Sequence, residues 1–78
     1  MSANKFIPIG PAAACSARAY HANAPAGDRA RPWPGALPVG EVAAAELVIG
    51  RELRGDSLRW YAAAFREEWD RLARATRA

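Results

Sequence analysis

The side chains with the most reactive chemistry in this sequence are few. They are Cys15, which is the only cysteine, Ser16 beside it, and His21, which is the only histidine. Nucleophilic catalysis needs a base within hydrogen-bond reach of the nucleophile, in a pocket that holds a substrate, and nothing around these residues predicts such a pocket. A metal site would need further ligands, which the chain does not supply at suitable spacing. We therefore expect no catalytic residue, no metal and no cofactor.

The single cysteine bounds the redox chemistry. Cys15 has no partner for a disulfide within the chain, and a lone thiol is typical of a reducing compartment. No apolar run approaches the ~18 residues of a membrane-spanning helix, and no secretory signal follows Lys5. The sequence thus predicts a cytoplasmic protein with no membrane contact. The alternative role for Cys15 is an intermolecular disulfide or a reactive thiol.

Charge is distributed unevenly along the chain. The formal net charge is +3, and it belongs to residues 1–39, because residues 40–78 hold equal numbers of basic and acidic side chains. A charge of this size gives little affinity for a phosphate backbone. It is compatible with weak attraction to an acidic protein surface.

The elements that would position a site follow from the prolines. All six prolines lie in the first 38 residues, whereas most large apolar residues at helical spacing follow them. Proline disfavours helix in the residue before it, so we expect residues 1–11 to be extended and residues 25–38 to be irregular. The alanine-rich stretch between them favours a short helix over about 12–22. We divide the chain into a basic Ala/Pro-rich arm and a helical segment, 1–39 and 40–78.

Two helices are predicted after the arm. The first, over about 40–53, has apolar residues at helical spacing and Gly55 as its C-cap. The second, over about 57–75, carries an apolar stripe about 120° wide. The linker of two or three residues predicts a helical hairpin, so the fold class is all-α. The stripe consists of Leu58, Tyr61, Ala62, Phe65, Trp69 and Leu72.

The stripe of the second helix is larger than the first helix can cover. The first helix offers only a few large side chains, and a chain this short usually needs a staple or a partner. Either the arm folds back over the stripe, or a second copy or another protein covers it. A homodimer of two hairpins would form a four-helix bundle. The large side chains of the first helix are Val42, Leu47, Ile49 and Leu53.

We expect the partner-binding surface to combine this stripe with two tryptophans. Trp60 projects about 150° from the stripe, and Trp33 lies between two prolines, so each is an anchor candidate. The alternative for each is packing within the same chain. In the arm, Phe6, Ile7 and Ile9 are expected to contact a partner, or else to be disordered. The partner-binding set is Trp33, Leu58, Trp60, Tyr61, Phe65, Trp69 and Leu72.

The favoured function is a small non-enzymatic regulator or inhibitor that binds a protein and occludes its interface with the amphipathic C-terminal helix. The first alternative is a structural or accessory subunit of a large assembly, such as a phage particle or a multisubunit enzyme, whose arm wraps a neighbour. The second alternative is a small nucleic-acid-binding protein. It is the least favoured, because Arg59 is the only basic residue in the first turn of the last helix.

Overall fold

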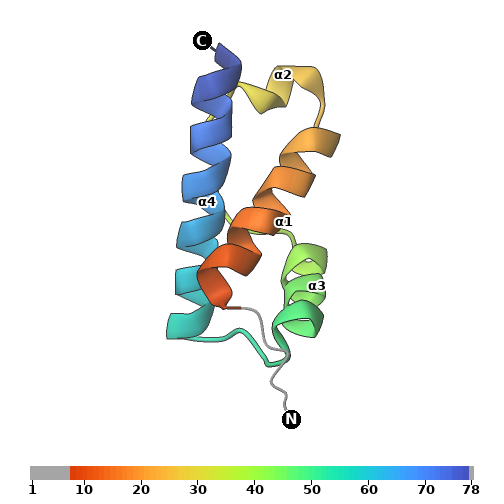
Figure 1. Ribbon diagram of the computed structural model, residues 1–78, viewed down its shortest axis with the longest axis vertical. Coiled ribbons are helices and arrows are strands. Elements are labelled where there is room, and N and C mark those ends of the chain that lie inside the picture. Colours follow the sequence, from red (N-terminus) through yellow and green to blue (C-terminus); the bar gives the residue numbers. More distant parts are fainter. Residues whose placement is uncertain (1–7, 78) are drawn as a thin grey trace.

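The computed structural model describes residues 8–77, and all regular structure in that range is helical. The prediction of an all-α fold is confirmed. The long helices α1 and α4 pack side by side and run in the same direction, while α3 runs in the opposite direction against α1 (Figure 1). In chain order the helices are α1 (Ile9–Asn23), α2 (Ala26–Arg29), α3 (Val39–Ile49) and α4 (Asp56–Arg77).

Three of the prolines begin helices rather than interrupt them. Pro8, Pro25 and Pro38 directly precede α1, α2 and α3, with φ between −61° and −56° and ψ between 144° and 148°. Proline fixes φ near this value without strain, and its carbonyl is free to accept the first hydrogen bonds of the following helix. The proline-rich part of the sequence therefore sets where helices start.

The N-terminal helix is longer than the sequence suggested. Composition favoured a helix over 12–22, and α1 spans Ile9–Asn23. The prediction of extended backbone up to residue 11 is wrong from Ile9 onward. Pro11 is tolerated because it occupies the third position of α1, where a backbone N–H has no acceptor within the helix. The first helical hydrogen bond runs from the Ala12 N–H to the Pro8 carbonyl, at 3.0 Å.

The helix predicted over 40–53 ends earlier, at Ile49. Gly50 takes the left-handed conformation (φ 88°, ψ 18°), and its N–H donates to the Glu46 carbonyl. Glycine adopts this conformation without the steric cost of a Cβ, so the helix stops there. Gly55, predicted as the C-cap, has φ 57° and directly precedes α4. The linker is therefore longer than predicted, and Leu53 within it is buried, with its N–H donating to the Glu46 carboxylate at 3.0 Å.

The core forms where the apolar stripe of α4 meets an alanine face of α1. On α4, Tyr61, Phe65 and Trp69 are at most 2% exposed, and on α1 the methyl groups of Ala13 and Ala17 are completely buried. Alanine adds little apolar area of its own, but it lets helices approach closely and gives large rings a surface to pack against. Of the alternatives for covering the stripe, folding back of the N-terminal segment is the one observed.

The helix α3 closes the lower end of this core, as oriented in Figure 1. Ala45 and Ile49 face inward and join Ile9 of α1 in the same apolar cluster. The antiparallel course of α3 and α4 agrees with the predicted hairpin, although the main packing partner of both helices is α1. Within the described residues, no helix combines the length and the apolar character needed to cross a bilayer.

Candidate functional site

Most residues predicted to bind a partner lie inside the protein. Tyr61, Phe65 and Trp69 are buried against the chain's own helices, and Leu58 and Leu72 are half-buried. A partner would reach the three aromatic rings only if the chain opened. The assignment of the α4 stripe to a docking surface is therefore corrected for these three residues, because α1 already occupies that side of α4.

The predicted arm contacts divide at the start of the described range. Ile9 is 4% exposed and packs in the core with residues of α3 and α4, so its contact is made within the chain. Phe6 and Ile7 lie outside the described residues. Of the three predicted arm residues, only Ile9 thus has an observed partner, and that partner is the protein's own core.

Trp33 belongs to a cluster of aromatic side chains beneath the loop between α2 and α3. Its ring centroid lies 4.9 Å from Phe65, 5.0 Å from Trp69 and 5.5 Å from Tyr20, with interplanar angles of 62° to 82°. These edge-to-face arrangements are the ones that ring quadrupoles favour. Of the two interpretations of Trp33, packing within the chain is the one observed.

Two hydrogen bonds from α4 hold this loop in place. The Trp33 backbone N–H donates to Oδ1 of Asp70 at 2.9 Å, and Nε1–H of Trp69 donates to the Arg31 carbonyl at 2.7 Å. Prolines on either side of Trp33 restrict the backbone dihedrals further. The loop is thereby held on α4 and forms a wall that faces α1.

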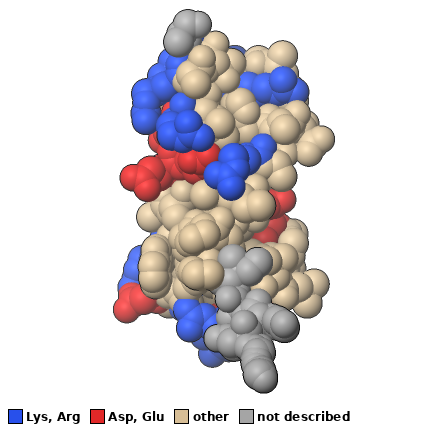
Figure 2. Space-filling view, in the orientation of Figure 1, with Lys and Arg blue, Asp and Glu red and all other residues tan. Residues whose placement is uncertain are grey.

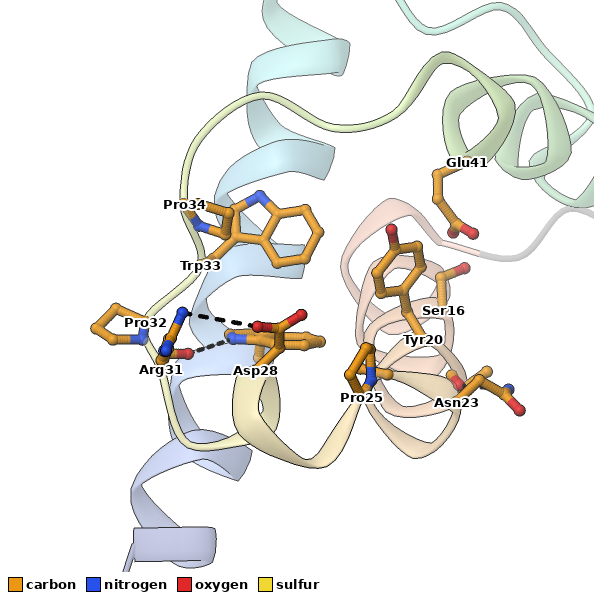
Figure 3. Close-up of a pocket in the computed structure, with 13 residues that line it drawn as sticks. Ser16, Tyr20, Asn23, Pro25, Asp28, Arg31, Pro32, Trp33, Pro34 and Glu41 are labelled. Atoms are coloured by element: carbon orange, nitrogen blue, oxygen red, sulfur yellow. Dashed lines mark hydrogen bonds and ion pairs between the residues drawn. The ribbon is translucent and has the colours of Figure 1, made fainter.

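This wall and α1 enclose a cleft of about 610 Å³, which we call the aromatic cleft (Figure 3). Tyr20, Trp33 and Trp69 line it, and an ion pair between Asp28 and Arg31, at 3.8 Å, lies on the loop side. The volume falls in the range of small-molecule pockets. Ser16 and the carboxylates of Asp28 and Glu41 also line it, and its described lining residues include no histidine or cysteine.

Within residues 8–77, two buried polar atoms near the cleft make no hydrogen bond, Nε1 of Trp33 and the hydroxyl of Tyr61. Burial raises the pKa of Tyr61 above its usual value; the neighbouring Ser16 hydroxyl opposes this shift, and the charge of Glu41 adds to it. Both unpartnered atoms are closed off from solvent. A ligand in the aromatic cleft would therefore not reach them without a rearrangement of the core.

The residues with reactive chemistry are not assembled into a site. Cys15 is exposed on α1, and the His21 ring lies 4.9 Å from the Trp69 ring with its Nε2 2.9 Å from the Arg29 carbonyl. Among residues 8–77, no three side chains of the metal-ligating types are placed to hold an ion. His21 has a packing role between α1 and α4.

Trp60 is exposed, as its angle to the stripe predicted. Its exposed fraction is 60%, and it borders a groove of about 490 Å³ between α1 and α4. The alternative in which Trp60 packs within its own chain is wrong for most of this side chain. The other residues that line this groove are Gly10, Ala14, Ala64, Glu67, Glu68, Arg71 and Arg74.

The outward side of α3 is the most unusual surface of the molecule. At about 100° per residue, half of the helix circumference carries only aliphatic or very small residues. The exposed fractions of its large members are 85% for Val39, 86% for Leu47 and 54% for Val48. In Figure 2 the surface at the lower right, where α3 lies, is tan between a red patch above it and the grey atoms beside it. We call this surface the α3 outer face: Val39, Gly40, Ala43, Ala44, Leu47 and Val48.

Sequence reasoning missed the α3 outer face because it assigned Leu47 to the covering of the last helix. A signal was present, however. Between Val39 and Ile49 the only polar side chains are Glu41 and Glu46, so the helix is apolar around nearly its whole circumference. One core contacts only one side of such a helix, and the opposite side stays exposed unless another chain covers it.

A comparison of this chain with known protein families, curated proteins and solved structures found no match, so its function is argued from the geometry alone.

Proposed function

We propose that this protein is a small non-enzymatic regulator or inhibitor that acts by binding another protein chain through the α3 outer face. The observation that carries the proposal is the exposure of Leu47 and Val39, at 86% and 85%, on a helix surface without a polar side chain. Exposed apolar patches with a polar rim are candidates for interaction sites, and Glu41 and Glu46 border this one.

The inner side of α3 is anchored in the core, and this rigidity favours binding at the outer face. The inner side of α3 is anchored through Ala45 and Ile49, which are at most 3% exposed. Its ends are defined by Pro38 and by the left-handed Gly50. Because the helix is already formed and fixed, a partner need not order it, and no ordering cost is added to the other entropy costs of association.

The geometry supports a helix-in-groove mechanism. Val39, Ala43 and Leu47 follow one another at i, i+4 and i+8 and form a ridge along α3, with Gly40 and Ala44 on the adjacent row. A groove that accepts such a ridge is closed to other ligands once α3 occupies it. Occlusion of a partner's interface, the mechanism we expected of α4, is therefore assigned to α3.

The aromatic cleft is a weaker basis for a function. Its rings already pack against one another, and the buried polar atoms nearest to it are closed off from a ligand. The role of an accessory subunit in a larger assembly stays a proposal of second rank, because it would use the same α3 outer face and differ only in the identity of the neighbour.

Site-specific photocrosslinking tests the proposal. A photoreactive benzophenone amino acid replaces Leu47, and the matched control carries it at Arg66, which is exposed on α4. Both proteins are irradiated at about 0.5 mM in an extract of cells that make this protein, so that a weak complex is also populated, after circular dichroism has shown equal helix content. We expect a discrete adduct with a protein chain, another copy included, from position 47 and none from position 66. No adduct from position 47, or identical adducts from both positions, would refute the proposal.

A further inference from the structure

We propose that the occupant of the α3 outer face is α3 of a second copy of this chain, packed antiparallel about a two-fold axis that passes between Ala43 and Ala44. This inference rests on the proposed function and names the partner for the same surface. It also specifies which residue of the second copy lies opposite each residue of the face, which makes the register testable.

The order of large and small residues along α3 suits such a pair. In an antiparallel pair centred between Ala43 and Ala44, residues at equal distances on either side of the centre lie opposite each other. Leu47 then lies opposite Gly40 of the second copy. At about 100° per residue these two positions are only about 20° apart around the helix, so both lie near the middle of the face. The largest side chain of the face meets the residue that has none, and symmetry makes this contact twice.

The space beside Gly40 is open in the single chain. A Cβ placed on Gly40 would meet no atom within 4 Å, so no side chain of the same chain fills this position. The methyl groups of Ala43 and Ala44 keep the centre of the face low, which permits the short interaxial distances of about 8 Å seen between helices with small contact residues. The side chain of Leu47 from a second copy can therefore pack into the open space beside Gly40.

Charge does not oppose the pairing at this face. Each chain has a formal net charge of +3, but none of the six residues of the α3 outer face is charged. The nearest acids, Glu41 and Glu46, lie at opposite edges of the face, about 140° apart around the helix. The carboxylate of Glu46 also accepts the Leu53 N–H of its own chain. Antiparallel packing in addition places the opposite ends of the two helix dipoles together.

The α3 outer face is as large as one helix can cover, and this small area predicts weak binding. Eleven residues form α3, so the face is about 16 Å long and about 10 Å wide, or about 160 Å² in projection. Stable interfaces bury about 800 Å² on each partner. A partner with a docking surface of that size would leave most of its own surface uncovered on this face. A second α3 has the same length and width as the face. We expect a reversible dimer with a dissociation constant on the order of 10⁻⁴ M.

Sedimentation equilibrium of the purified full chain, from about 10 µM to about 1 mM, tests the inference. The wild type should change from monomer to dimer across this range. Gly40→Leu fills the open space beside Gly40 and should weaken dimerisation at least tenfold. Helix content and melting temperature should stay equal or rise, because leucine is the better helix former and its Cβ meets no atom of the described residues within 4 Å. The matched control is Ala63→Leu at an exposed position of α4, which should dimerise as the wild type does.

A size swap tests the register. In Gly40→Leu combined with Leu47→Ala, the large and small positions are exchanged, so an antiparallel pair should regain a dissociation constant within about threefold of the wild type. A second disruptive variant, Leu47→Asp, covers the case in which Gly40→Leu does not fold; at a position 86% exposed it should abolish dimerisation and leave the thermal melt unchanged. If Gly40→Leu alone abolishes dimerisation and the double variant does not regain it, the antiparallel register is wrong.

The inference is also overturned by a chain that stays monomeric to about 1 mM, or by a dimer that both Gly40→Leu and Leu47→Asp leave unchanged. These results are distinguishable from a failure of the proposed function. If the chain is monomeric but the photoreactive group at position 47 captures a different protein, the α3 outer face binds a protein and only the identity of the occupant is wrong.

Discussion

Tyr61 shows how one buried atom affects the stability of this small fold. Its ring is fully buried, but among the described residues its hydroxyl makes no hydrogen bond of normal distance and angle, although the Ser16 hydroxyl lies nearby. A buried hydroxyl without a partner costs about 1–3 kcal/mol. We therefore expect Tyr61→Phe to keep the fold and to raise the free energy of unfolding by about 1 kcal/mol, which corresponds to a melting temperature about 4–8 °C higher. A thermal melt at neutral pH measures this, and a decrease of similar size would show that the hydroxyl is satisfied.

The same substitution should change the response to alkaline pH. Burial raises the pKa of Tyr61 above the ordinary 10.0, so above that pH the native state retains a proton that the unfolded chain has lost. Stability is then present below the unfolded pKa and falls as the pH rises toward the folded pKa. Urea unfolding between about pH 9 and about pH 11 should show a shallower decline for Tyr61→Phe than for the wild type. Equal slopes would contradict this assignment.

Glu68 joins the two long helices through charge. Its carboxylate pairs with Arg71 on α4 at 2.7 Å and with Arg18 on α1 at 3.3 Å. The hydrogen bond from Arg71 is the main cause of its lowered pKa, and Arg18 contributes in the same direction. A lowered pKa stabilises the fold above the ordinary value of 4.5, and this contribution is lost as the pH falls through the folded pKa.

We therefore expect Glu68→Gln to be less stable than the wild type at neutral pH, by no more than about 1 kcal/mol because both arginines are half-exposed. The difference between the two proteins should shrink as the pH falls through the folded pKa, because the wild-type carboxylate then becomes protonated. Glu67→Gln, on an exposed neighbouring residue, is the matched control and should behave as the wild type. A deficit that persists at acid pH would mean that the charge is not its cause.

Local sequence rules predicted individual side chains unevenly. They placed Trp60 away from the apolar stripe, as observed, because a helical angle depends only on position within one helix. They did not indicate that Asp70 accepts the backbone N–H of Trp33, 37 residues away in the chain. Spacing within a helix carries no information about such distant partners.

At the scale of elements, the periodicity of the last helix was the most reliable signal. The predicted range of 57–75 compares with Asp56–Arg77 in the structure. The end of α3 was misjudged because Gly50 and Gly55 are both suitable stops by local rules, and Leu53 continues the helical spacing. The choice between the two glycines depends on tertiary packing, in which Leu53 reaches the core from a loop.

The alanine face of α1 was the element that sequence reasoning undervalued. Ala17 is fully buried against the core, where small size matters more than apolar area. We expect Ala17→Leu to destabilise the fold by about 1–3 kcal/mol although it adds apolar surface, because the larger side chain separates α1 from α4. The matched control is Ala22→Leu at an exposed position of the same helix, which should change the stability by no more than about 0.5 kcal/mol. Chemical denaturation of both variants measures the difference, and equal stabilities would show that α1 does not pack closely.

The whole molecule differs from the sequence-based expectation in one respect that determines the rest. Counting large apolar residues left open whether the arm, a second copy or another protein covers α4. The core instead draws on both parts of the chain, with Ile9 and Ala13 before residue 40 and Phe65 after it. That interior could not be foreseen from composition, because it depends on which helices meet. With α4 covered, the exposed apolar surface on α3 becomes the candidate for binding.

Thermal unfolding at about 1 µM and at about 10 µM, followed by circular dichroism, tests most directly whether the chain closes its own core. At these concentrations the proposed weak dimer is dissociated, so the result reports on the single chain. The predicted result is one cooperative transition with the same midpoint at both concentrations. A midpoint that falls on dilution, or a gradual loss of helix without a transition, would show that α1 does not suffice to cover α4 and would contradict the account.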